Sequence, residues 1–209
     1  MLDTPIKSTE IGRAWVEYLA HILNNGSKIF DSREDILEVG PLHFVINDFS
    51  DKENIILREG NEHITEIYRA KMFSREIIPE LNSTYGDRFF DNLGFDQIAD
   101  TLKRLRENPW SKSCFIPLVV PNDPGPRIPC LSAVQFAIRG NKILLFATFR
   151  SQNAFNSYGN FYGLRDLQQF MARELGKDVG DIFFTVNFPH IYFSDIQESK
   201  DILARNSLY

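Results

Sequence analysis

The chain has 209 residues, enough for one substantial hydrophobic core and short for two domains. Its 43% hydrophobic and 24% charged residues are typical of a globular protein, and its 18 phenylalanines indicate a core packed around aromatic rings. A formal net charge of −5 argues against a nucleic acid polymer as partner, although a small phosphate ester needs only a local cluster of donors.

The sequence carries no signal that would direct it to a membrane or out of the cell. No apolar run approaches about 18 residues, so we expect no membrane-spanning segment. The N-terminal residues lack the basic, apolar and small-residue order of a secretory signal. Cys114 and Cys130 are the only cysteines, which predicts no disulfide framework and favours a reducing cytoplasm. No repeat or Pro/Gly-rich linker divides the chain, so residues 1–209 are expected to form a single domain.

The N-terminal half alternates between helical and extended patterns. Apolar residues recur at helical spacing over Ile11–Leu23 and stop at the Asn-Asn-Gly that follows, which predicts a helix. Two short strands are predicted, over Ile36–Val39 and Leu42–Ile46. Helices are then expected across residues 61–81 and over Phe95–Arg106, the second of which ends before Asn-Pro.

The C-terminal half is rich in predicted strands. Cys114–Val120 is almost continuously apolar, which predicts a strand buried on both faces. We expect the whole to form one helix-backed mixed sheet in an α+β domain. The other predicted elements are a hairpin of Leu131–Ile138 and Ile143–Phe149, a helix over Tyr162–Leu175 ended by Gly176, and strands over Asp181–Phe188 and Ile191–Phe193.

Cys130 is the candidate nucleophile. It follows a proline-rich loop and opens a predicted strand, with Arg127 three positions before it. A cysteine beside cations has a lowered pKa and reacts as a thiolate. Cys114 lies inside an apolar run and is interpreted as a core residue. Since a lone cysteine is more often structural than catalytic, the assignment of Cys130 depends on the residues that accompany it.

Polar residues suited to a phosphorylated sugar and a base follow the predicted hairpin. Arg150 and Ser151 offer a planar guanidinium fork and a hydroxyl, a natural phosphate clasp. Asn160 stands just before a predicted helix, where it either caps the helix or presents its amide to a base edge. His190 and Tyr192 lie two apart on one face of an extended chain and suit sugar hydroxyls, although each also fits a purely structural role.

In this order, these residues resemble the thymidylate synthase family. The likeness is nearly continuous from Cys130 to Ile196 and thinner upstream. The family's Pro-Cys followed by Gln-Phe on one strand matches Pro129–Phe136, which implies that Gln135 contacts the substrate. Its Arg-Ser phosphate segment matches Arg150-Ser151, its pyrimidine-reading asparagine matches Asn160 with one residue deleted between, and its His-x-Tyr matches His190 to Tyr192.

Upstream, the resemblance implies three further site residues. Lys112 stands where the family has a pair of arginines that cross the dimer interface to the partner's phosphate. Arg33 lies where the family has a phosphate loop with an arginine, and Glu66 is the candidate for its catalytic glutamate. Asn153 replaces the family's aspartate that helps to hold the folate ring, and Leu131 replaces the histidine that usually follows the nucleophile.

The resemblance implies a thymidylate synthase-like fold that pairs sheet to sheet as a homodimer. It also implies that the Cys130 thiolate adds to C6 of a pyrimidine nucleoside monophosphate, after which C5 takes a one-carbon unit from methylenetetrahydrofolate. An asparagine at position 160 favours uracil over cytosine, because it meets N3–H and O4 with both an acceptor and a donor. Three outcomes stay open: a uridylate methyltransferase, a pyrimidine nucleotide hydroxymethylase, or a nucleotide-binding homologue without transferase activity. No metal site is predicted.

Overall fold

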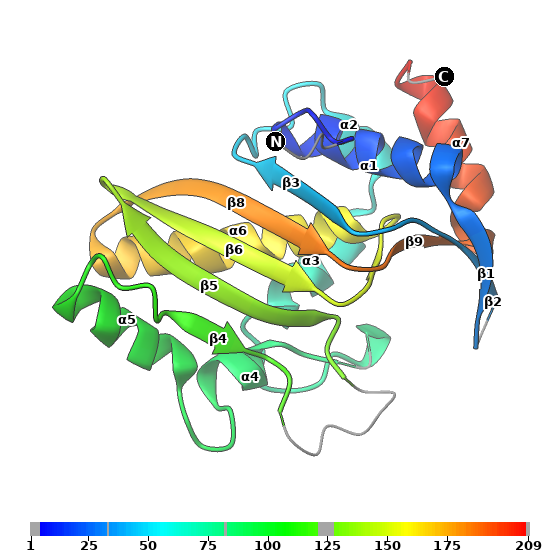
Figure 1. The fold of residues 1–209 in the computed structure, drawn as a ribbon. Coiled ribbons are helices and arrows are strands. Elements are labelled where there is room, and N and C mark those ends of the chain that lie inside the picture. The colour runs from blue at the N-terminus through cyan, green and yellow to red at the C-terminus, as the bar shows by residue number, and fades with distance from the viewer. Residues whose placement is uncertain (1–4, 33, 82, 121–127, 208–209) are drawn as a thin grey trace.

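The computed structural model describes residues 5–32, 34–81, 83–120 and 128–207 (Figure 1). The predicted site residue Arg33 and the neighbouring cation Arg127 lie outside these ranges. The helices are α1 Ile11–Asn25, α2 Ile55–Glu59, α3 Glu62–Lys71, α4 Gly86–Phe90, α5 Gln97–Glu107, α6 Ser157–Leu175 and α7 Ile196–Arg205. The strands are β1 Ser27–Asp31, β2 Glu34–Glu38, β3 Leu42–Ile46, β4 Phe115–Pro117, β5 Leu131–Arg139, β6 Lys142–Phe149, β7 Gln152–Asn153, β8 Asp178–Val186 and β9 Pro189–Tyr192.

The strands form two sheets, which confirms a mixed α+β architecture and corrects the expectation of one sheet. The larger sheet has the order β3-β8-β6-β5-β4, in which only β6 and β8 run parallel. The smaller sheet has the order β1-β2-β9-β7, in which only β7 and β9 run parallel. The strand β1 was not predicted; all five of its residues are exposed, so it lacks the alternation that marks a half-buried strand.

The same two chain segments run through both sheets. β6 continues through Arg150 and Ser151 into β7, and β8 continues through Asn187 and Phe188 into β9. The two segments stay paired across the break, because the Asn187 amide donates to the Phe149 carbonyl at 2.9 Å and the Gln152 amide donates to the Phe188 carbonyl at 3.2 Å. Residues at this junction are therefore held by backbone on both sides.

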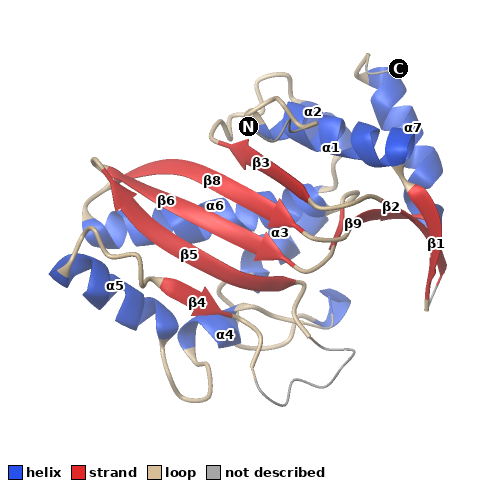
Figure 2. Cartoon of the chain, viewed as in Figure 1, coloured by secondary structure: helices blue, strands red, loops and turns tan. Residues whose placement is uncertain are grey.

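Helix α6 packs against β6 and β8 and lies behind the larger sheet (Figure 1). The core there is aromatic, as the phenylalanine content predicts: Phe44 stacks on Phe184 with ring centroids 4.9 Å apart, and Phe161 meets Phe184 edge-on at 4.8 Å. Figure 2 shows that, within the described residues, no helix covers the opposite face of β5, β6 and β8. One sheet face is thus buried and the other is left open.

The segment that leads into α6 is tied to α1 by a hydrogen bond. The Trp15 indole of α1 donates to the carbonyl of Ala154 at 3.0 Å, in the segment between β7 and α6. The structure confirms the helix stop at Gly176, whose φ of 61° suits a residue without a side chain. Helix α6 begins at Ser157, earlier in the chain than the predicted start at Tyr162. Asn160 therefore lies inside the helix, and Asn156 is the N-cap residue.

Two further expectations are wrong in part. The helix expected across residues 61–81 ends at Lys71, because the chain folds back: the Tyr85 amide donates to the Lys71 carbonyl at 2.8 Å, and Gly86 lies against the backbone of Phe73 and Ser74. The strand expected over Cys114–Val120 is only β4, at the edge of the sheet. It is not buried on both faces, since Phe115 is 56% exposed.

Candidate active site

Cys130 lies directly before β5, at the junction between the two sheets. The Arg150 amide donates to the Cys130 carbonyl at 2.8 Å, which fixes the start of β5 against the end of β6. The Cys130 side chain is exposed, and the Ser151 hydroxyl lies 3.8 Å from its sulfur. Cys114 differs, as expected: it is buried, and burial raises the pKa of its thiol. Of the two cysteines, only Cys130 presents its sulfur to a ligand.

The Arg150 guanidinium is held beside this cysteine by three hydrogen bonds. Its Nε donates to the Pro129 carbonyl at 3.2 Å, and one Nη donates to the Ile128 carbonyl at 2.8 Å. The other Nη donates to the Ser151 hydroxyl at 3.2 Å. A guanidinium carries five N–H groups, so both terminal nitrogens keep a further donor for an anion. The predicted clasp residues therefore lie together, next to the predicted nucleophile.

His190 and Tyr192 approach the same junction from β9. Asn153 of β7 stands opposite His190, and the His190 and Tyr192 rings meet edge-on with centroids 5.2 Å apart. Burial lowers the pKa of His190, so its ring is neutral at neutral pH. Its Nδ1 lies 3.1 Å from the Phe188 carbonyl, which can only accept, so Nδ1 carries the proton. Nε2 is then an acceptor, as a sugar hydroxyl requires.

Asn160 is buried in the first turn of α6, and its side-chain oxygen has no hydrogen-bond partner within the described residues. A buried carbonyl oxygen without a donor costs about 1–3 kcal/mol, so such an atom marks a place where a ligand donor fits. The residue before Asn160 in α6, Gly159, lies against the ring of Tyr68 of α3. Tyr68 in turn interacts electrostatically with both Cys130 and Tyr192. Tyr68 thus links the start of α6, which carries Asn160, to the surroundings of Cys130.

Three residues that were not assigned to the site from the sequence lie near Cys130 in the structure: Tyr68, Lys71 and Tyr85. Each of them interacts electrostatically with Cys130. The Tyr85 hydroxyl accepts from the Leu131 amide at 3.4 Å, and the Lys71 ammonium lies 4.1 Å from the centre of the Tyr85 ring. Tyr68 and Lys71 are three apart on a helix and so share a face, which is the only signal in the sequence that could have joined them.

Asn153, the predicted folate contact, is already engaged on both sides of its amide. Its nitrogen donates to the Asp195 carboxylate at 3.1 Å, and its oxygen accepts from the Phe155 amide at 3.1 Å. Asp195 is partly buried, and burial raises the pKa of its carboxyl. The family's acidic residue at this position is thus replaced by an asparagine that is hydrogen-bonded to a carboxyl group one side chain away.

Comparison with known proteins agrees with this arrangement. The family model described as thymidylate synthase matches residues 13–208. The chain belongs to the thymidylate synthase family. A putative thymidylate synthase of Methanosarcina mazei is 31% identical over 204 residues, which cover 95% of this chain and 94% of that protein.

Two other relatives show the same likeness. A putative thymidylate synthase of Methanothermobacter marburgensis is 24% identical over 221 residues, covering 95% of this chain and 97% of that protein. A thymidylate synthase of Francisella tularensis subsp. holarctica is 30% identical over 147 residues, covering 62% of this chain and 54% of that protein. The resemblance drawn from the motifs is therefore confirmed at the level of the family.

Three of the residues assigned by resemblance have other neighbours in the structure. Glu66 lies on the exposed face of α3, where it interacts electrostatically with Arg69. Gln135 lies five residues along β5 from Cys130, about 16 Å at strand spacing, and its side chain donates to the Lys112 carbonyl at 2.7 Å. Gln135 therefore cannot contact a base held at the Cys130 of its own chain. The role of Glu66, and a role of Lys112 in a partner's site, stay predictions.

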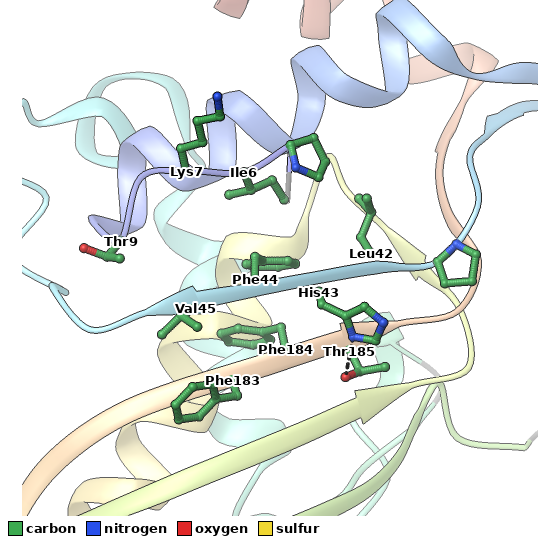
Figure 3. Close-up of a pocket in the computed structure, with 12 residues that line it drawn as sticks. Ile6, Lys7, Thr9, Leu42, His43, Phe44, Val45, Phe183, Phe184 and Thr185 are labelled. Atoms are coloured by element: carbon green, nitrogen blue, oxygen red, sulfur yellow. Dashed lines mark hydrogen bonds between the residues drawn. The ribbon is translucent and has the colours of Figure 1, made fainter. Parts of the chain in front are cut away.

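A hollow of about 710 Å³ lies at the β3 edge of the larger sheet, and Cys130 is not part of its lining. Figure 3 shows Phe44, Phe183 and His43 of its lining, together with Ile6 and Lys7 from the N-terminal segment. Its walls are mainly apolar, with no acid or nucleophile converging on it within the described residues, so we do not assign the chemistry to it.

In the described part of the chain, every helix falls short of the length or apolar character needed to span a bilayer. The same residues contain no group of three or more His, Cys, Asp or Glu placed to hold a metal ion.

Proposed function

We propose that the protein transfers a one-carbon unit to C5 of a uridylate nucleotide of the dUMP type, through a covalent bond between Cys130 and C6. The observation that carries the proposal is the placement of the exposed Cys130 sulfur 3.8 Å from the Ser151 hydroxyl, with the Arg150 guanidinium bound to that same hydroxyl at 3.2 Å. A nucleophile and a phosphate clasp thus share one junction, as a nucleoside monophosphate spanning them requires.

The residues of the chain take separate parts in this reaction. Arg150 and Ser151 would bind the phosphate, while the neutral His190 and Tyr192 would bond sugar hydroxyls. The Cys130 thiolate would add to C6, which moves negative charge onto the O4 side of the ring and makes C5 nucleophilic. Asn160, whose buried oxygen lacks a donor, would accept from N3–H, and its amide nitrogen would donate to O4 as that charge develops. C5 would then bond to the one-carbon unit and lose its proton to water; the tetrahydrofolate nitrogen would leave that carbon, and Cys130 would be expelled when hydride or water adds to it.

Methylenetetrahydrofolate is the proposed one-carbon donor, and it would supply the hydride as well if the product is a methyl group. Asp195 and Asn153 are the residues that would meet its pterin ring, since their paired side chains lie beside His190 of the nucleotide site. A hydroxymethyl product requires the same Cys130 chemistry but water in place of hydride. One observation favours this hydroxymethyl alternative: Asn153 has both ends of its amide engaged, so the usual folate contact at this position is altered.

One experiment tests the proposal and separates its outcomes. Isotopically labelled methylenetetrahydrofolate is incubated with each pyrimidine monophosphate, in ribose and deoxyribose forms, and the nucleotide product is weighed by mass spectrometry. We expect label on a uracil nucleotide, and the product mass then distinguishes a methyl from a hydroxymethyl group. Nucleotide binding without label transfer to any of the four substrates would instead support a binding protein that has lost the transferase activity.

We further propose that two chains pair through the open face of the larger sheet. One row of residues crosses all five strands on this face, and its outer members are large and apolar. Phe146 stacks on Phe183 with ring centroids 4.7 Å apart, and Phe115 is 56% exposed at the edge. The row consists of Phe115, Gln135, Phe146, Phe183 and Val45. An uncovered apolar row of this kind is typical of an isologous interface.

The homodimer predicts a measurable role for Lys112, which is exposed beside Gln135 on this face. Sedimentation at micromolar concentration is expected to give a dimer, and Phe146→Asp should shift it toward monomer. Lys112→Ala should weaken nucleotide binding while leaving the dimer intact, because the cation would reach the partner's phosphate. A wild-type monomer, or a Lys112→Ala variant with unchanged nucleotide affinity, would remove this part of the proposal.

A further inference from the structure

Lys71 is a buried lysine for which the chemistry above has no use. Lys71 is only 7% exposed, although lysine is among the residue types least often buried without a partner. Within the described residues, no carboxylate forms an ion pair with it and no acceptor bonds its ammonium group. Two aromatic rings flank the ammonium instead, Tyr85 at 4.1 Å and Tyr68 at 5.5 Å from nitrogen to ring centre.

The fold fixes this lysine in place from two sides. Lys71 is the last residue of α3, and its carbonyl accepts from the Tyr85 amide at 2.8 Å and from the Thr84 hydroxyl at 3.2 Å. The Tyr85 hydroxyl in turn accepts from the Leu131 amide, the residue after Cys130. One tyrosine therefore contacts both the lysine ammonium and the backbone that carries the cysteine. The ammonium is positioned relative to Cys130 and is not free to reach solvent.

A buried ammonium without a carboxylate is costly, and the cost is visible in its acidity. Burial lowers the pKa of Lys71 to about 8, and a negative charge on Cys130 is the one opposing influence. The other titratable groups that face it stay neutral near pH 7: burial raises the pKa of Tyr68 to about 12 and that of Tyr85 well above its usual value. Arg150, which acts on Tyr85 and lies beyond it, is a second cation and cannot serve as partner.

We propose that the Lys71 ammonium is the counter-charge of the Cys130 thiolate. Lys71 is then a positioning residue: it keeps its proton, while the Cys130 thiol gives its own proton to solvent and the resulting negative charge is stabilised across the Tyr68 and Tyr85 rings. When the Cys130 sulfur bonds to C6, its negative charge passes to the substrate. When the sulfur is released again, the thiolate that re-forms is once more paired with the Lys71 ammonium. The inference rests on the proposed function for the use of the thiolate, but not for the charge coupling itself.

The coupling is tested on the free protein, without nucleotide or folate. The rate of Cys130 alkylation by iodoacetamide is measured against pH, and peptide mass analysis separates Cys130 from the buried Cys114. Lys71→Met should raise the midpoint by about one pH unit, and so slow alkylation at pH 7 about tenfold. Lys71→Arg, which keeps the charge, should restore most of the rate, and Lys103→Met, at an exposed lysine, should leave the profile unchanged.

The outcomes are separable from those of the proposed function. An unchanged midpoint in a folded Lys71→Met variant would overturn the inference, as would an equal shift in Lys71→Arg. If Lys71→Met fails to fold, Lys71→Gln, which also removes the charge, takes its place, and an unchanged midpoint in that folded variant overturns the inference. Because no substrate is present, a positive result stands even if no one-carbon transfer is detected.

Discussion

Replacing Lys71 by methionine should stabilise the protein at neutral pH. The side chain is 7% exposed, and burial lowers the pKa of its ammonium from 10.5 to about 8. A shift of about 2.5 units corresponds to a penalty of about 3 kcal/mol on the charged form, at 1.36 kcal/mol per unit. The two ring contacts offset about 0.5–2 kcal/mol of that and are lost with the charge. Methionine has a similar length and no charge, so Lys71→Met should raise the free energy of unfolding by about 1–3 kcal/mol at pH 7.

The sign of the pH dependence is fixed by the direction of the shift. Because the pKa of Lys71 is lower in the folded state, between pH 8 and 10.5 the unfolded chain binds more protons than the folded one. The stability of wild type should therefore rise with pH across this window, as the penalty disappears. Lys71→Met carries no such group, so its advantage over wild type should be largest below pH 8 and vanish toward pH 10.5.

Urea unfolding followed by circular dichroism at pH 7 and at pH 10 measures both effects. Lys103→Met is the matched control, because its side chain is 71% exposed and should change stability little at either pH. A Lys71→Met variant that is less stable than wild type by the same amount at both pH values would refute the reasoning. The lysine stem would then stabilise the core by packing, and its charge would cost nothing.

Three further substitutions test the assignment of the site. Arg150→Ala should reduce the affinity for a uridylate by about 2–5 kcal/mol and leave nucleoside affinity unchanged; equal losses for both ligands, by calorimetry, would contradict a phosphate clasp. Asn160→Asp should raise turnover of cytidylate relative to uridylate, because a protonated carboxyl meets the cytosine edge better than an amide; an unchanged ratio of kcat/KM would place Asn160 outside the base site. Cys114→Ser should lower the midpoint of thermal unfolding yet keep turnover, since its thiol is buried in the core; loss of turnover in a folded variant would reassign the nucleophile.

The sequence predicted best those elements whose pattern is local. The helix α1, the β5–β6 hairpin and the Gly176 stop each follow from spacing or turn chemistry within one segment, and the structure confirms them. The helix expected to reach residue 81 failed for a non-local reason: the chain from Thr84 returns to the Lys71 carbonyl. No periodicity within the helix itself encodes that contact.

The site residues divide in the same way, between those that a sequence motif predicts and those that only the folded structure brings together. Cys130, Arg150, Ser151 and His190 could be chosen because their motifs stand in a family order, and the segments that bridge the two sheets then bring them together. Gln135 was placed at the substrate by the same order, but strand geometry carries it to the open sheet face. Lys71 was missed because a lysine at the end of a polar helix is ordinarily a solvated charge, and only the packing of Tyr85 over it shows that it is buried.

The most direct test of the account is covalent trapping at Cys130. The protein is incubated with a 5-fluorouridylate nucleotide and methylenetetrahydrofolate, digested, and its peptides are weighed. Fluorine at C5 cannot leave as the proton does, so the account predicts a stable adduct on the peptide that contains Cys130, dependent on the folate and absent from Cys130→Ser. The same variant should lose turnover and keep nucleotide binding. An adduct on any other residue, or full activity in Cys130→Ser, would contradict the central claim.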